Sequence, residues 1–103
     1  MTFLGEADDE GRYPPYGKVA VVGVVGNEDG AHHVAAECFQ ALADVGWTIP
    51  PMVSCYWVGE AMQPVDFKDL AEVPDPIVTA ARSLAANAAH LAKLLKREAY
   101  PAP

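Results

Sequence analysis

The chain has 103 residues, enough for one small domain, and 51% of them are hydrophobic, so we expect it to fold. Its formal net charge of -7 argues against binding to nucleic acid or to an anionic membrane surface. No apolar run is long enough to span a bilayer, and the acidic N-terminus lacks the features of a signal peptide. Cys38 and Cys55 fit neither a metal site nor a disulfide framework. These features predict a cytoplasmic protein with reduced thiols.

Two strands and a helix are predicted in the first part of the chain. Residues 18–25 (KVAVVGVV) have no polar face, which is typical of a strand in a parallel sheet covered by helices on both faces. Residues 31–45 carry one apolar stripe at helical spacing. Residues 48–58 predict a second strand, and its two adjacent prolines favour a position at the sheet edge. Together they form one right-handed βαβ unit.

The remaining segments are a connection, a helix and two ends. Residues 59–74 form a long connection, and such loops in compact domains tend to be functional or lid-like. Residues 75–97 predict a helix with Asp75 as its N-cap and Pro76 in its first turn. We expect residues 1–17 to be a solvated arm, residues 18–97 to be the domain, and residues 98–103 to be a fraying tail.

The predicted sheet is short of strands. The first strand is apolar on both faces and needs a hydrogen-bonded neighbour on each side, but the second strand supplies only one. A long, apolar, unprotected edge is a feature that natural proteins avoid. The pattern therefore predicts self-association through this edge, a partner that completes the sheet, or a piece of a larger fold.

The loop between the first strand and the helix is a candidate ligand site. Gly26 and Gly30 bracket three polar residues, permit positive φ and allow close approach of the backbone to a ligand. Ligands of α/β proteins bind where strands hand over to helices; an ordinary strand–helix turn is the alternative. Tyr56 and Trp57 end the second strand, where aromatic rings wall a pocket or pack in the core.

The two histidines after the loop suggest no catalytic or metal site. His32 and His33 lie in the first turn of the predicted helix, and no third ligand stands at metal-binding spacing. We expect surface histidines, with an imidazole that faces a bound ring as the alternative. No residue is assigned as catalytic and none as a metal ligand.

The stretch KVAVVGVVGNEDGAHHVAAECFQALADVGWTIP, then YWVGEAM and an Ala-rich terminal helix, resembles the C-terminal half of flavodoxin-like proteins. It is most similar to the actinobacterial NAD(P)H-dependent FMN reductase and multimeric flavodoxin group. The resemblance covers about Asp8 to Lys96. It implies an α/β fold, a flavodoxin-like parallel three-layer αβα sandwich of which only the C-terminal βαβα portion is present. Residues 18–25 and 48–58 would be the last two strands of a sheet ordered 2-1-3-4-5.

The resemblance also implies FMN as cofactor and NAD(P)H as electron donor. Its implied cofactor-binding residues are Gly26, Asn27, Glu28, Asp29, Gly30, Tyr56 and Trp57. The family's phosphate-binding loop follows its first strand, so a second copy or a chain that supplies the missing strands would complete the site. The alternative is a truncated, non-enzymatic flavodoxin-like module that self-associates and binds no flavin.

Overall fold

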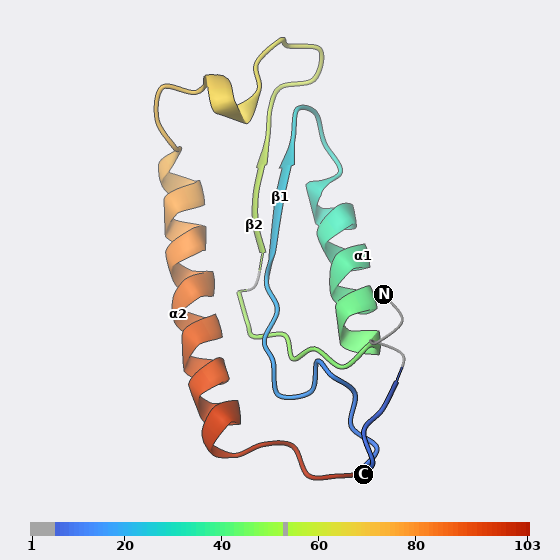
Figure 1. The fold of residues 1–103 in the computed structure, drawn as a ribbon. Helices are drawn as coiled ribbons and strands as arrows, with labels where there is room; N and C mark the ends of the chain where they lie inside the picture. The colour runs from blue at the N-terminus through green and yellow to red at the C-terminus, as the bar shows by residue number, and fades with distance from the viewer. Residues whose placement is uncertain (1–5, 53) are drawn as a thin grey trace.

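The computed structural model describes residues 6–52 and 54–103; Val53, within the predicted second strand, and the first five residues of the arm lie outside this range. The elements in chain order are β1 (Val22–Gly26), α1 (Ala31–Asp44), β2 (Ser54–Val58), the short 3-10 helix η2 (Phe67–Asp69) and α2 (Asp75–Arg97). A helix follows each strand, so the chain has a βαβα order (Figure 1).

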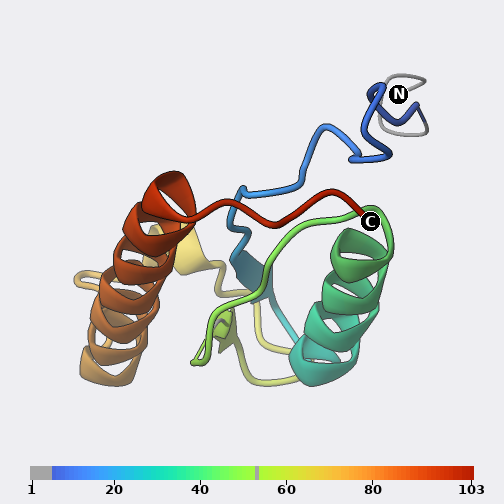
Figure 2. The same ribbon diagram turned by 90° about the horizontal axis from the view of Figure 1, so that it is seen from below.

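The two strands form a parallel sheet between two helices. Their register pairs Val22 with Ser54 and Gly26 with Val58. Helix α1 packs mainly on β1 and helix α2 on β2, and the two helices lie on opposite sides of the sheet (Figure 2). The α/β class and the parallel pairing are confirmed, and the arrangement is compatible with part of an αβα fold. The flavodoxin-like assignment stays a prediction.

Both strands are shorter than predicted. The earlier parts of the two predicted strands meet only in a bridge between Val19 and Thr48. There the Thr48 N–H donates to the Lys18 carbonyl and the Ala20 N–H to the Thr48 carbonyl, each over 3.0 Å. The two adjacent prolines that follow Thr48 have no N–H to donate, and among the described residues regular pairing joins Val22–Gly26 to Ser54–Val58.

The helices follow the predictions closely. Helix α2 covers the predicted residues 75–97, with a proline in its first turn and Lys96 and Arg97 in its last. The predicted N-cap was wrong by one residue, because Pro74 precedes the helix and Asp75 already belongs to its first turn. Helix α1 ends one residue before the predicted boundary at Val45. Gly30 caps its start in the left-handed region, with φ of 87°. Gly26 is not among the glycines with positive φ, because it is the last residue of β1; of the two loop glycines, only Gly30 uses the left-handed region.

Burial is limited in this molecule. Among the described residues only Pro15, Ala31, Ala35 and Pro50 are buried. The radius of gyration is 16.6 Å, whereas a compact domain of this size would have about 13 Å. Along β1 the exposure alternates, and Val25 is 65% exposed. One face of β1 is therefore largely uncovered.

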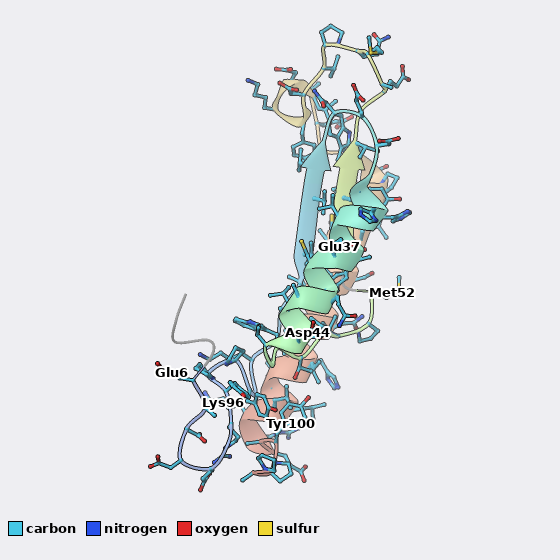
Figure 3. All side chains as sticks on the ribbon, turned by 90° about the vertical axis from the view of Figure 1, so that its right-hand side faces the viewer. Glu6, Glu37, Asp44, Met52, Lys96 and Tyr100 are labelled. Atoms are coloured by element: carbon cyan, nitrogen blue, oxygen red, sulfur yellow. The ribbon has the colours of Figure 1, made fainter. Side chains whose placement is uncertain are left out.

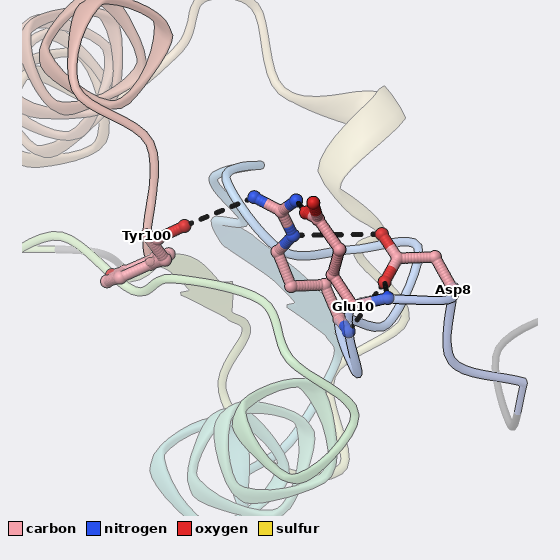
Figure 4. Close-up of polar contacts among 4 residues, drawn as sticks. Asp8, Glu10 and Tyr100 are labelled. Carbon is pink, nitrogen blue, oxygen red and sulfur yellow. Dashed lines mark hydrogen bonds and ion pairs between the residues drawn. The ribbon is translucent and has the colours of Figure 1, made fainter. Parts of the chain in front are cut away.

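The arm and the tail contact each other, while most of their described residues are exposed; the division into arm, domain and tail stays a prediction. The Arg12 guanidinium pairs with Asp8 at 3.7 Å and with Glu10, and its Nη1 donates to the Tyr100 carbonyl over 3.4 Å (Figure 4). The Tyr100 hydroxyl lies 2.8 Å from Thr48 Oγ1. The C-terminal segment is thus fastened to the arm and to the chain that follows α1.

Candidate functional site

The candidate site lies where both parallel strands end. The loop after β1 and the long connection after β2 meet there, at the opposite end of the molecule from Tyr100 (Figures 1 and 3). The Gly59 N–H donates to the Gly26 carbonyl over 3.2 Å. A Cβ at Gly59 would lie 3.0 Å from the Trp57 ring and 3.2 Å from the Asn27 carbonyl oxygen. These are tight contacts, so any larger residue at this position would push the Trp57 ring or the Asn27 carbonyl aside by a few tenths of an ångström.

A hollow of about 440 Å³ opens at this strand end, a size within the usual range for small-molecule sites. Trp57 and Phe67 form an edge-to-face pair with ring centroids 5.6 Å apart. The hollow combines this aromatic surface with polar groups, including one ammonium and one carboxylate. Its lining residues are Val25, Gly26, Asn27, Trp57, Asp66, Phe67 and Lys68.

The helix η2 holds Phe67 in place. The Asp66 N–H donates to Asp69 Oδ2 over 2.9 Å, and the Asp69 N–H donates to the Asp66 carbonyl over 2.9 Å. These two bonds close a single tight turn, which the polar residues on either side of Phe67 favour. The turn fixes the position of the Phe67 ring against Trp57.

Tyr56 lies on the other face of the sheet. Its ring makes an edge-to-face contact with His32 of α1, with centroids 4.7 Å apart. Successive side chains of a strand point to opposite faces, so Tyr56 faces α1. Cys55, two residues before Trp57 and on its face, donates its thiol to the Ile77 carbonyl of α2 over 3.6 Å. The two aromatic residues near the end of β2 therefore lie on opposite faces of the sheet. Both border a second hollow beside the start of α2, but only Trp57 lines the hollow at the strand end.

The seven residues implied by the resemblance divide into three groups. Gly26, Asn27 and Trp57 line the hollow. Glu28, Asp29 and Gly30 are exposed in the loop and do not line it, and Tyr56 faces α1. That any of them binds a cofactor stays a prediction.

Part of the hollow was not predicted from the sequence. Asp66, Phe67 and Lys68 line it, but they had been assigned only to a long connection of the functional or lid-like kind. The signal that singles them out is an aromatic residue inside a short acidic turn. His33, in contrast, is exposed as expected, and its Nε2 lies 3.7 Å from Glu37 Oε1.

Two further properties concern residues 6–52 and 54–103. Within this part of the chain, no three histidine, cysteine or acidic side chains cluster closely enough to hold a metal ion. None of its helices combines the length and apolarity needed to cross a membrane.

The chain is similar to one curated enzyme over most of its length. It is 36% identical over 93 residues to the 8-demethyl-8-aminoriboflavin-5'-phosphate synthase of Streptomyces davaonensis. The match covers 89% of this chain and 36% of the enzyme. A second match, 39% identical over 54 residues, is to a divalent metal cation transporter of Mycobacterium bovis. It covers 52% of this chain and only 8% of the transporter, so we attach no transport role to it. No protein-family model matches the chain.

A solved structure shares the fold. The crystal structure of RosB with its bound intermediate, 8-demethyl-8-formylriboflavin-5'-phosphate, aligns with a TM-score of 0.81 and 34% identity. The alignment covers 92% of this chain and 38% of RosB. The chain thus spans little more than a third of each of these relatives. Neither is named as a flavodoxin or an FMN reductase, so that finer assignment stays a prediction. The chain has the fold of one part of a flavin-associated protein.

Proposed function

We propose that this chain forms one wall of a binding site for a flavin phosphate, FMN or a related riboflavin 5'-phosphate. The observation that carries the proposal is the shared fold with RosB, whose crystal structure holds a riboflavin phosphate derivative. The position of the hollow adds support, because open parallel sheets bind ligands at the carboxyl ends of their strands.

The residues of the hollow suit a flat, partly polar ring. The Trp57 and Phe67 rings offer an apolar surface for the isoalloxazine system, and Asn27 and the loop backbone offer hydrogen-bonding groups for its pyrimidine edge. Such contacts tune the potential of a flavin, while the flavin supplies the redox chemistry.

The residues of the loop after β1 are poorly suited to binding the phosphate of the flavin. Glu28 and Asp29 precede α1, so their carboxylates would repel a phosphate at the helix N-terminus that otherwise attracts anions. The proposal therefore assigns the phosphate to groups outside this loop, on a second copy or on a chain that supplies further strands. Hydride transfer from NAD(P)H to the flavin, implied by the sequence resemblance, stays a prediction about the completed site.

A non-enzymatic module that self-associates and binds no flavin is the second candidate. The uncovered face of β1, where Val25 is 65% exposed, favours it. Flavin fluorescence distinguishes the two candidate functions, because only a chain that binds a flavin quenches it.

The test is a titration of the full chain with FMN, followed by flavin fluorescence and visible absorption. We expect saturable quenching, and we expect Trp57→Ala to weaken binding by about tenfold or more, since stacking on one aromatic side chain is worth about 1–3 kcal/mol. Gly26→Val should weaken it as well, because a side chain at this position hinders the close approach of the ring to the loop backbone. A protein that stays colourless and leaves added FMN unquenched contradicts the proposal and supports the second candidate.

The glycine variant has a matched control in the same strand. A Cβ at Gly26 would lie 3.9 Å from Val58 Cγ1, and a Cβ at Gly23 would lie 3.9 Å from the Cys55 carbonyl oxygen. An added Cβ thus meets only ordinary van der Waals contact at either glycine, but only Gly26 lines the hollow. Equal loss of FMN binding in Gly26→Val and Gly23→Val would remove the loop from the site.

A further inference from the structure

Lys68 brings a positive charge to the hollow at the strand end. Among the described residues that line this hollow, it is the one with a basic side chain. Lys68 directly follows Phe67 in η2, and the Phe67 ring pairs with Trp57, so the lysine borders the same hollow as the aromatic surface. The other basic residues of the chain lie before β1 or within α2.

No carboxylate within the described part of the chain forms an ion pair with Lys68. The ion pairs found in residues 6–52 and 54–103 involve Arg12 and His33 instead. The Asp69 carboxylate, next to Lys68 in sequence, accepts the Asp66 N–H over 2.9 Å, so it is engaged within the turn. An ammonium group of this kind has its three donors available for a negative charge on a ligand.

A flavin phosphate carries negative charge in two places. The phosphate is charged whether the flavin is oxidised or reduced. The ring becomes negative only on reduction, when two electrons and one proton enter it, the proton binds N5, and the charge remains at N1 and the neighbouring carbonyl oxygen. A positive charge beside the ring therefore stabilises the reduced form more than the oxidised form and raises the reduction potential.

We propose that Lys68 makes the hollow selective for the redox state of the flavin, because its ammonium group binds the reduced, anionic ring more tightly than the oxidised ring. The inference rests on the proposed function, in which the ring lies against Trp57 and Phe67. The ring is the charge that Lys68 meets, since it borders the hollow beside these two aromatic residues. Asp66 lines the same hollow, and its carboxylate acts in the opposite sense.

The test is the midpoint potential of FMN bound to the full chain, measured by anaerobic reduction against a reference dye. We expect Lys68→Gln to lower this potential by about 20 mV, which for a two-electron couple is about a fivefold change in the ratio of the two dissociation constants. About fivefold is the effect of a unit charge roughly 4 Å away in a water-like medium, as suits an exposed side chain. Lys68→Arg keeps the charge and should keep the potential.

Two further variants control for charge and for place. Asp66→Asn removes a negative charge from the same hollow and should raise the potential, while asparagine keeps an oxygen that can accept a hydrogen bond. Lys93→Gln changes the net charge as Lys68→Gln does, but Lys93 is exposed and lies near the C-terminal end of α2, far from η2 (Figure 1). Its potential should equal that of the natural chain.

The outcomes separate this inference from the proposed function. A natural chain that leaves FMN unquenched overturns both. A chain that binds FMN with the same potential in Lys68→Gln as in the natural sequence overturns this inference alone, and so does an equal shift in Lys93→Gln. If Lys68 contacted the phosphate, Lys68→Gln would weaken oxidised and reduced FMN equally and leave the potential unchanged, so this result also counts against the inference.

Discussion

Tyr100 is expected to hold the C-terminal tail and the N-terminal arm on the domain. Its hydroxyl lies 2.8 Å from Thr48 Oγ1, its carbonyl accepts from Arg12, and its ring stands edge-on to Tyr16 with centroids 6.2 Å apart. We therefore predict that Tyr100→Ala destabilises the whole domain, although the residue is only the fourth from the end of the chain.

The size of the effect follows from the covered area of the side chain. Tyr100 is 40% exposed, and a fully buried aromatic residue removes roughly 150–250 Å² from water. At about 25 cal/mol per Å², and with a discount for a compact unfolded state, the covered part is worth about 2 kcal/mol. For a domain of this size, 2 kcal/mol corresponds to a fall in Tm of roughly 8–16 °C. Tyr100→Phe keeps the ring and should cost only about 0.5–1 kcal/mol.

The assay is urea or thermal unfolding followed by circular dichroism, with a double-mutant cycle at the hydroxyl pair. Thr48→Val removes the partner hydroxyl, so Tyr100→Phe should cost almost nothing in that background. A Tyr100→Ala variant as stable as the natural chain would refute the reasoning. An equal cost of Tyr100→Phe with and without Thr48 would show that the hydroxyl pair contributes no stability.

Two other properties of single residues can be tested in the same way. Gly46 has φ of 107° and an added Cβ would lie 2.7 Å from the Tyr16 ring, so Gly46→Ala should cost about 2–3 kcal/mol in unfolding experiments. Gly17 has φ of 82° but open space around it, so Gly17→Ala should cost only about 1 kcal/mol; equal costs would exclude the ring contact as the cause. Phe67→Ala in a Trp47→Phe background, where Trp57 is the remaining tryptophan, should shift Trp57 emission to the red, and an unchanged spectrum would contradict the aromatic pair.

The elements themselves were largely predictable from local pattern. Helix α2 begins and ends at the predicted residues because its Asp-Pro start and its basic last turn are both encoded within a few residues. The strands were harder to bound, because the same apolar composition continues through residues 18–21, where only Val19 bridges Thr48. Regular pairing needs a backbone N–H at each bonding position, and the two adjacent prolines of the second segment have none.

The candidate site was predictable as a place but not as a set of side chains. A loop bracketed by glycines after a buried strand indicates the carboxyl end of a sheet, and Gly26, Asn27 and Trp57 do line a hollow there. Tyr56 and Trp57 are adjacent in sequence, yet Tyr56 contacts His32 while Trp57 contacts Phe67. Whether Tyr56 or Trp57 points toward the hollow depends on the orientation of the strand in the sheet. No local sequence pattern specifies that orientation.

The sequence by itself determined the α/β class, the parallel pairing, the helices and the strand-end loop, because each depends on neighbouring residues or on a short periodicity. Only the tertiary structure decided that Asp66, Phe67 and Lys68 join the hollow and that Tyr100 fastens the tail to Arg12 and Thr48. Those contacts join residues far apart in the chain, and they exist only when the packing of β1, β2 and the two helices brings their surfaces together.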